Sequence, residues 1–302
     1  MEEHGNPDGA RARSGGDVSC LAATLAPEWL SLREPADHEA RSTELVRRLT
    51  PRLALGELVV HDLGSGTGSM TRWLAPQLPR AQHWVLHDLD ETLLAHAFAR
   101  TAALRFEDGA ISISTKHGDV TRIDAHELEG TTIVTASALL DLLTDDEVTA
   151  IASACVKSGS PALFTLSVTG RVQLTPTHPL DDRIAAAFNA HQRRSVDGRR
   201  LLGPDAVTHA TASFTELGAE VFVADTPWQL GADHARLMAE WLPGWVTAAC
   251  EQEPELVGSA RAYLRQRTAE AAGGCLQVTV GHSDLLAMPP RVRSNQTSTR
   301  HV

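Results

Sequence analysis

Short apolar runs alternate with amphipathic segments over most of the chain. Five early runs predict strands: 58–62, 83–87, 111–115, 132–136 and 161–168. Helical patterns lie between them at 69–75, 91–100 and 144–157. This rhythm is typical of βαβ units, in which a helix returns the chain to the same end of a parallel sheet. Two further strands are predicted at 218–225 and 275–281, the last after a long helical stretch.

Breaks in this pattern divide the chain. Its 302 residues, 42% of them apolar, predict one large domain with extensions. We predict a disordered N-terminus over 1–17, a helical cap over 18–50, a main domain over 51–288 and a disordered tail over 289–302. Two insertions, 170–202 and 230–272, interrupt the βα rhythm. Both start near the carboxyl ends of strands, where open α/β sheets bind ligands, so both are predicted walls of a substrate pocket.

The first strand runs into a glycine loop. Asp62 ends the apolar run, Gly64, Gly66 and Gly68 alternate, and a helical pattern begins at once at Ser69. Glycine permits positive φ and lets a ligand approach the backbone, and the free N–H groups of a helix start can bind that ligand. A dinucleotide fingerprint, G-x-G-x-x-G, would need a third glycine where Ser69 stands.

The pattern D-x-G-x-G-x-G instead resembles the loop of class I S-adenosylmethionine-dependent methyltransferases, and the resemblance extends over about residues 45–287. It implies a doubly wound α/β fold, with a mostly parallel seven-stranded sheet, a final antiparallel strand, helices on both faces and an N-terminal helical lid. It also implies methyl transfer from S-adenosyl-L-methionine, with S-adenosyl-L-homocysteine as the product.

The resemblance implies a set of cofactor contacts. They are Asp62, Gly64, Ser65, Gly66, Gly68, Asp88, Leu89, Asp119, Val120, Ser137 and Arg33. Asp88 corresponds to the acid that accepts hydrogen bonds from the ribose hydroxyls, whereas nearby Asp90 is more simply a helix N-cap. Asp119 corresponds to an acid near the adenine amine. The alternative is a turn residue, because a Gly-Asp pair such as Gly118-Asp119 is favoured in turns.

A basic residue of the N-terminal helix is expected at the cofactor carboxylate, because arginine offers a bidentate fork. Arg33 is the candidate, and Arg72 on the glycine-loop helix is its rival. A solvated helix face is the alternative for Arg33. For Arg41 we favour that alternative, with an i,i+4 ion pair to Asp37.

The insertions supply the candidate substrate residues. His178 and His191 are candidates for a catalytic base or a substrate anchor, because histidine has an unperturbed pKa near neutrality, and a structural role is the alternative. Asn189 is a candidate for binding polar substrate groups. Trp241 and Trp245, one turn apart, indicate an apolar substrate pocket, with packing onto the sheet as the alternative.

We expect no metal site. Asp141, Asp145 and Asp146 are better explained by a loop and the acidic first turn of a helix. His282 is expected to lie at the far edge from the site, and both His282 and Asp284 are expected to be structural.

The net charge of the chain disfavours some classes of function. A net charge of −11 and only two lysines disfavour nucleic-acid binding. No apolar run reaches the ~18 residues of a membrane span, and the N-terminus lacks a secretory pattern, so a cytoplasmic enzyme without membrane contact is expected. The predicted function is methyl transfer to a small-molecule acceptor, of the kind found in secondary metabolism. The alternatives are an RNA methyltransferase and a non-catalytic S-adenosylmethionine-binding regulatory protein; a homodimer is left open.

Overall fold

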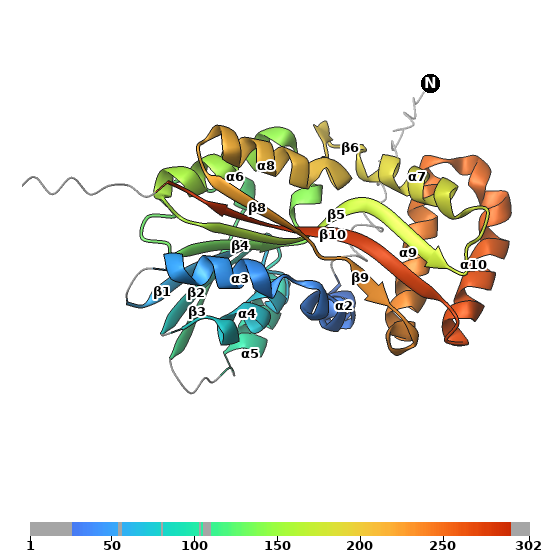
Figure 1. Cartoon of the computed structure of the whole chain (residues 1–302), viewed down its shortest axis with the longest axis horizontal. Coiled ribbons are helices and arrows are strands. Elements are labelled where there is room, and N and C mark those ends of the chain that lie inside the picture. The colour runs from blue at the N-terminus through green and yellow to red at the C-terminus, as the bar shows by residue number, and fades with distance from the viewer. Residues whose placement is uncertain (1–25, 54–55, 80, 103, 105–109, 291–302) are drawn as a thin grey trace, which may run out of the picture.

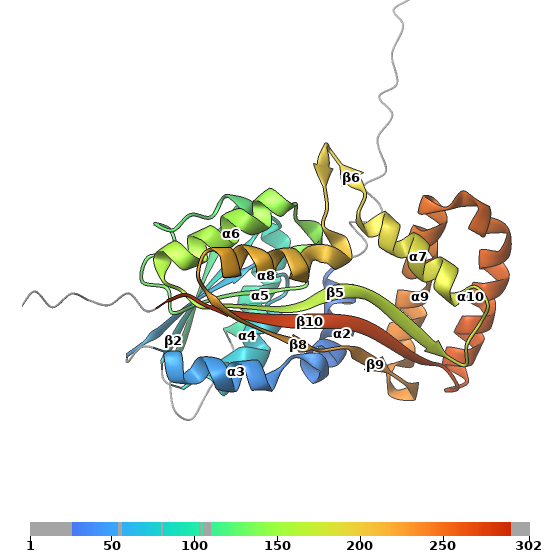
Figure 2. The same cartoon turned by 45° about the horizontal axis from the view of Figure 1, so that its top comes forward.

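A single large sheet runs through the molecule, with helices on both faces (Figures 1 and 2). The computed structural model describes residues 26–53, 56–79, 81–102, 104 and 110–290. The predicted disorder of 1–17 lies outside these residues, as does most of the predicted tail at 289–302.

The strand order is β3-β2-β1-β4-β5-β10-β8, with β9 paired to β10. The strands are β1 (Leu58–Leu63), β2 (Gln82–Asp88), β3 (Ile111–His117), β4 (Ile133–Ser137), β5 (Ala162–Thr175), β8 (Glu220–Asp225), β9 (Trp228–Leu230) and β10 (Gln277–Met288). A separate hairpin consists of β6 (Ser195–Val196) and β7 (Arg199–Arg200). Strands β1 to β5 pair in parallel, whereas β10 is antiparallel to its neighbours. The predicted mostly parallel sheet with a late antiparallel strand is therefore confirmed.

The helices form two layers and an outer lobe. They are α2 (Pro27–Ala40), α3 (Thr43–Leu49), α4 (Ser69–Leu74), α5 (Glu91–Thr101), α6 (Asp145–Ser158), α7 (Asp181–Gln192), α8 (Ala206–Glu216), α9 (Ala235–Gln252) and α10 (Val257–Ala272). One face of the sheet packs on α3, α4 and α5 around Trp84, and the other packs on α6 and α8 around Phe164 (Figure 1). Burial of these strand faces accounts for the apolar runs seen in the sequence.

Two strands are longer than the apolar pattern predicts. β5 continues past Val168 to Thr175, and β10 continues past Gly281 to Met288. Polar residues after Val168 end the apolar run, but pairing with β10 extends the strand, with Thr175 opposite Gln277. This two-stranded ribbon carries α7, α9 and α10 as an outer lobe (Figures 1 and 2). The first insertion therefore starts after Thr175, not at residue 170.

Helix α2 buries charge where most helices bury apolar side chains. Glu34 and Asp37 are buried on it, and so is Arg41 directly after its last residue. Because such groups are costly to bury without partners, polar contacts must hold this helix in place. Those partners lie on the glycine loop, on the strand ends and on β9, so α2 marks the site.

Candidate active site

The glycine loop joins β1 to α4 by a backbone that only glycine adopts easily. Gly64, Gly66 and Gly68 have φ of 63°, 52° and 79°. At Gly68 a Cβ atom would also lie 2.9 Å from Cγ2 of Thr101 on α5. The third glycine thus lets the start of α4 lie close against α5, while the first two shape the turn.

Asp88 ends β2 beside this loop. Its Oδ2 accepts from the Gly66 N–H at 2.8 Å, and its Oδ1 accepts from the Asp90 N–H at 3.0 Å. Burial raises the pKa of this carboxyl. Leu89 follows with 65% of its surface exposed, which leaves an apolar face next to an acid. Asp90 itself accepts from the Thr92 N–H and so N-caps α5, which is the role predicted for it.

Asp119 lies two residues after β3, and Ser137 ends β4. Asp119 accepts from the Thr121 N–H and hydroxyl, which lowers its pKa, and so caps a short turn at Val120. Asp119 therefore has the turn-capping role that was given as the alternative to an adenine contact. This role does not depend on its other contacts. Ser137 ends β4 and its Oγ accepts from Arg41 at 2.8 Å.

Three buried polar atoms of the loop have no hydrogen-bond partner among the described residues. They are Oδ2 of Asp62, Oγ of Ser65 and Oγ1 of Thr67. The other oxygen of Asp62 accepts from Thr135 at 2.7 Å, and burial raises the pKa of Asp62 to about 7. Buried acceptors without a donor are costly, so these atoms fit a ligand that brings donors, such as an ammonium group.

Helix α2 covers this loop. A Cβ atom on Gly66 would lie 3.2 Å from Leu30 Cδ1. Glu34 accepts from Arg72 on α4 at 2.6 and 2.7 Å, and from Arg100 on α5 at 3.0 Å. Arg72, the predicted rival for the cofactor carboxylate, is thus engaged by Glu34. The N-terminal helix is a lid, as the resemblance implied.

The environment of Arg41 differs from the solvated one that was predicted. Arg41 is 4% exposed, and it donates to the hydroxyls of Ser69, Ser137 and Thr165. Within the described part of the chain, no carboxylate lies within ion-pairing distance of it. Its guanidinium also lies over the Trp73 ring. A buried guanidinium that donates only to hydroxyls can bind a carboxylate ligand, and the expectation of a solvated Arg41 is wrong.

Arg33 makes the i,i+4 ion pair that was expected of Arg41. Its Nε lies 3.0 Å from Oδ2 of Asp37, and its guanidinium stacks 4.9 Å from the centre of the Trp228 ring. Asp37 also accepts from the Trp228 indole N–H at 3.0 Å. Arg33 is therefore neutralised beside β9, and Arg41 replaces it as the candidate for the cofactor carboxylate.

The two candidate histidines are held inside the outer lobe. His178 accepts from the Leu180 N–H at 3.1 Å and its ring packs 4.9 Å from that of Tyr263. It follows Thr175, which lies ten residues of strand, or about 33 Å, beyond the Thr165 paired with Ser137. His191 places Nε2 at 2.9 Å from Glu251 and Nδ1 at 3.2 Å from Arg194. The structure does not bring either ring to the glycine loop.

The predicted substrate residues serve packing. Trp241 and Trp245 stack with ring centres 5.0 Å apart on α9, and Trp245 is 2% exposed. Pro243 lies inside that helix without ending it. Asn189 donates to the Gly170 carbonyl at 2.8 Å, which ties α7 to β5. The contacts of the two tryptophans match the packing alternative.

Asp284 is a structural hub. It is fully buried and accepts from the N–H groups of Ser42 and Leu166 and from the Thr226 hydroxyl. His282 packs 5.1 Å from Trp228, close to α2. The predicted position of His282 was wrong because β10 runs back into the middle of the sheet.

Asp141 was expected to be an ordinary loop residue. It lies just after β4, its Oδ1 is buried without a hydrogen-bond partner among the described residues, and burial raises its pKa to about 6. Leu139, two residues earlier, packs 3.1 Å from a Cβ position on Gly64. A carboxylate so placed borders the glycine loop; only its position after the fourth predicted strand could have signalled it.

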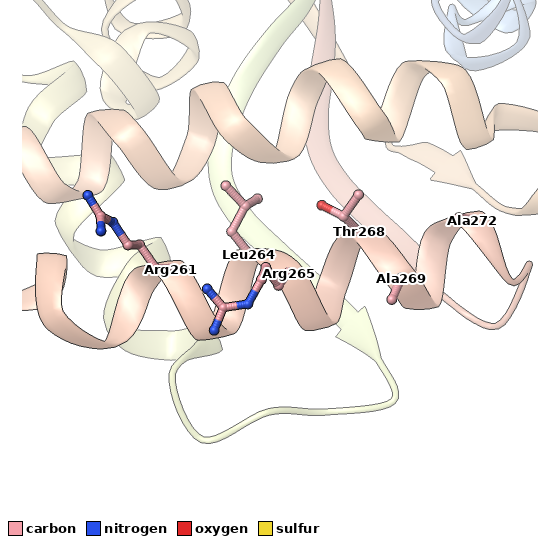
Figure 3. A pocket seen from close by; sticks show the side chains of 6 residues that line it. All are labelled: Arg261, Leu264, Arg265, Thr268, Ala269 and Ala272. Carbon is pink, nitrogen blue, oxygen red and sulfur yellow. The ribbon is translucent and has the colours of Figure 1, made fainter.

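Other surface features lie apart from this site. A hollow along α10 is lined by Arg261, Leu264, Arg265, Thr268, Ala269 and Ala272, and it belongs to the outer lobe (Figure 3). Over the described chain, no three metal-ligating side chains gather as a metal site would require. Among those same residues, no helix has the length and apolar character that crossing a bilayer demands.

Fold and site together define a Rossmann-like α/β protein with a cofactor loop at the carboxyl edge of its sheet. The family model described as Methyltransferase domain matches residues 60–161, from β1 to the start of β5. Residues 60–161 therefore form a methyltransferase domain. Its cofactor is S-adenosylmethionine. The unpaired Oδ2 of Asp62 and the guanidinium of Arg41, which is bonded only to hydroxyl oxygens, fit the ammonium and carboxylate groups of that molecule.

Solved structures with a similar fold differ widely in sequence. The cyclopropane synthase MmaA2 from Mycobacterium tuberculosis has 13% identity and a TM-score of 0.47, covering 90% of this chain and 100% of that one. A methyltransferase from Geobacter sulfurreducens, in complex with S-adenosyl-L-homocysteine, has 19% identity and a TM-score of 0.41, covering 87% and 98%. No curated protein matches the sequence.

Proposed function

We propose that this enzyme methylates a small-molecule acceptor. The observation that carries the proposal is the lid: α2 lies directly on the glycine loop, with Leu30 against Gly66 and Glu34 bound to two arginines. A lid of this kind favours an acceptor small enough to be enclosed. When bound, the cofactor supplies an activated methyl group.

The residues around the loop divide the work of holding that cofactor. Arg41 would bind its carboxylate, Asp62 its ammonium group and Asp88 its ribose hydroxyls, while Leu89 would cover the adenine. Alignment of the reacting atoms accounts for most of such catalysis, because positioning is worth ~7–11 kcal/mol at best.

Charge disfavours RNA as the acceptor. The basic runs at 193–194 and 199–200 contain arginines that are locally paired: Arg193 with Asp205 and Arg199 with Glu147. Backbone binding needs unpaired cations on one face, which supports the small-molecule reading over the RNA alternative.

Isotope transfer tests the proposal. Purified enzyme is incubated with methyl-labelled S-adenosylmethionine and either a small-metabolite extract or total RNA, and each product fraction is counted. Label in the metabolite fraction is expected, and label only in RNA would contradict it. If the enzyme binds S-adenosylhomocysteine by calorimetry and labels neither fraction, the non-catalytic regulatory alternative is favoured.

A further inference from the structure

A carboxylate outside the expected cofactor contacts borders the glycine loop. Asp141 lies on the turn after β4, between the start of that turn at Leu139 and the capped helix α6. Leu139 packs against Gly64, whereas Arg33 on the lid is the charged group that acts on Asp141. Asp141 therefore lies where the lid, the glycine loop and the carboxyl end of β4 meet.

The free oxygen of Asp141 lacks a donor. Its Oδ1 is inaccessible to solvent and meets no hydrogen-bond donor among the described residues. Arg33 does not supply one, because its guanidinium is engaged bidentately by Asp37 and stacks on Trp228. Arg199, which donates to the neighbouring Leu142 carbonyl, is held by Glu147. A buried carboxylate oxygen without a donor is costly, so a bound molecule that supplies an O–H or N–H group would relieve that cost.

We propose that Asp141 is the catalytic base and that the acceptor is an O–H or N–H nucleophile, such as a phenol or an amine. This inference rests on the proposed small-molecule function. The acceptor's proton passes to Oδ1 of Asp141 as a lone pair on the same oxygen or nitrogen forms the new bond to the methyl carbon. The electron pair of the broken carbon–sulfur bond stays on sulfur, which thereby loses its positive charge, so atoms and charges balance.

Two further observations support Asp141 over the other bases. The rings of His178 and His191 are engaged in the outer lobe. Burial also gives Asp141 a pKa of about 6, close to the operating range in which a base is partly ionised and still basic enough to take a proton. A carboxylic acid acceptor would arrive already ionised and be repelled by Asp141.

The test compares wild type with Asp141→Asn and with Asp146→Asn, a matched control in the exposed first turn of α6. All three are first titrated with S-adenosylhomocysteine by calorimetry, and affinities within twofold of one another are expected. Failure of the wild type to bind would overturn the proposed function and this inference together. Loss of binding in Asp141→Asn alone would overturn only the inference, because a base for the acceptor is not needed by the cofactor.

Proton uptake gives a readout that needs no acceptor. Between pH 7.5 and pH 5, the ligand-free wild type and Asp146→Asn should each take up nearly one proton more than Asp141→Asn, centred near pH 6. Equal uptake would show that Asp141 has an ordinary pKa and a partner, which overturns the proposal.

Methyl transfer is then measured on a panel of amines, phenols and carboxylic acids with labelled cofactor. Label in amines or phenols is expected, with kcat/KM in Asp141→Asn reduced between a hundredfold and ten-thousandfold at pH 7. The residual rate should rise with pH as the acceptor ionises unaided. Label in carboxylic acids would overturn the proposal, and so would an Asp141→Asn rate within twofold of wild type. If no class of acceptor is labelled, the proton-uptake measurement alone determines whether the proposal stands.

Discussion

Arg41 is a buried cation whose hydrogen-bond acceptors are all hydroxyls. Ser69 begins α4, Ser137 ends β4 and Thr165 lies in β5, so one guanidinium joins three elements of the cofactor edge. Burial lowers the pKa of Arg41, yet arginine stays charged in proteins. Burying this charge without an anionic partner is therefore unfavourable in the ligand-free protein. An anionic ligand would offset that cost.

Replacing Arg41 with Met should weaken binding of S-adenosylhomocysteine at least tenfold, because each charge-assisted hydrogen bond is worth ~1.5–3 kcal/mol. The melting temperature of the ligand-free protein should stay level or rise, since a buried unpaired charge is removed. Calorimetry and thermal unfolding measure the two effects. Arg48→Met, at an exposed position of α3, serves as the control, and an equal loss of affinity there would contradict the assignment.

Asp62 predicts a pH dependence of stability. Its folded pKa of about 7 lies above the usual value, so the folded carboxyl holds a proton that the unfolded one releases between pH 4 and pH 7. Stability from this group is therefore present at low pH and is lost as pH rises through 7, by about 1.4 kcal/mol per pH unit at most. Urea unfolding at pH 5 and pH 7 should show wild type losing stability relative to Asp62→Asn; a constant difference would be the contrary result.

At the scale of elements, α2 is held by charge pairing. Its hydrogen bonds to Arg72, Arg100 and the Ser69 carbonyl join it to α4 and α5, while Trp228 joins it to β9. Trp29, Leu32, Ala36 and Ala40 of the same helix pack against the apolar core of the outer lobe, so charge pairing and apolar burial together hold α2.

Replacing Glu34 with Gln should loosen this lid. Two arginines would lose their shared carboxylate, and amide hydrogen exchange across α2 should quicken by roughly tenfold to a hundredfold, as expected for ~1.5–3 kcal/mol. Exchange in β1 and β4 should not change. Glu28→Gln, exposed on the same helix, is the control. Unchanged exchange in Glu34→Gln would mean that other contacts hold α2.

At the scale of the whole molecule, the outer lobe has its own centre. Arg267 is fully buried, donates to both oxygens of Asp181 at 2.8 and 2.7 Å, and sits beside Tyr263, whose hydroxyl donates to the same carboxylate. None of these atoms touches the glycine loop. This ion pair therefore stabilises the lobe without contacting the cofactor site.

Arg267→Ala should destabilise the protein by about 3–5 kcal/mol, because Asp181 is left buried without its counter-ion. Urea unfolding measures this loss. The folded variant should still bind S-adenosylhomocysteine with wild-type affinity, and weakened binding would instead couple the lobe to the site. Arg265→Ala, exposed on the same helix, should change stability little.

The sequence by itself determined the strand–glycine–helix unit, the capped helices α5 and α6, and the mostly parallel sheet. These follow from local causes: apolar periodicity, glycine's freedom at positive φ, and capping side chains two or three residues from their partners. Asp88 beside the loop was also predictable, because parallel strands end at one edge.

Only the tertiary structure decided which charged groups meet. Arg41 finds Ser69 28 residues away, Arg72 finds Glu34 38 residues away, and Asp284 finds Ser42 242 residues away. The same holds for the length of β5, which pairing with β10 extends past its apolar run. A side chain's partner depends on how distant elements pack, and no local pattern records that; Arg41 and Asp141 were therefore visible as residues in the sequence but not as a site.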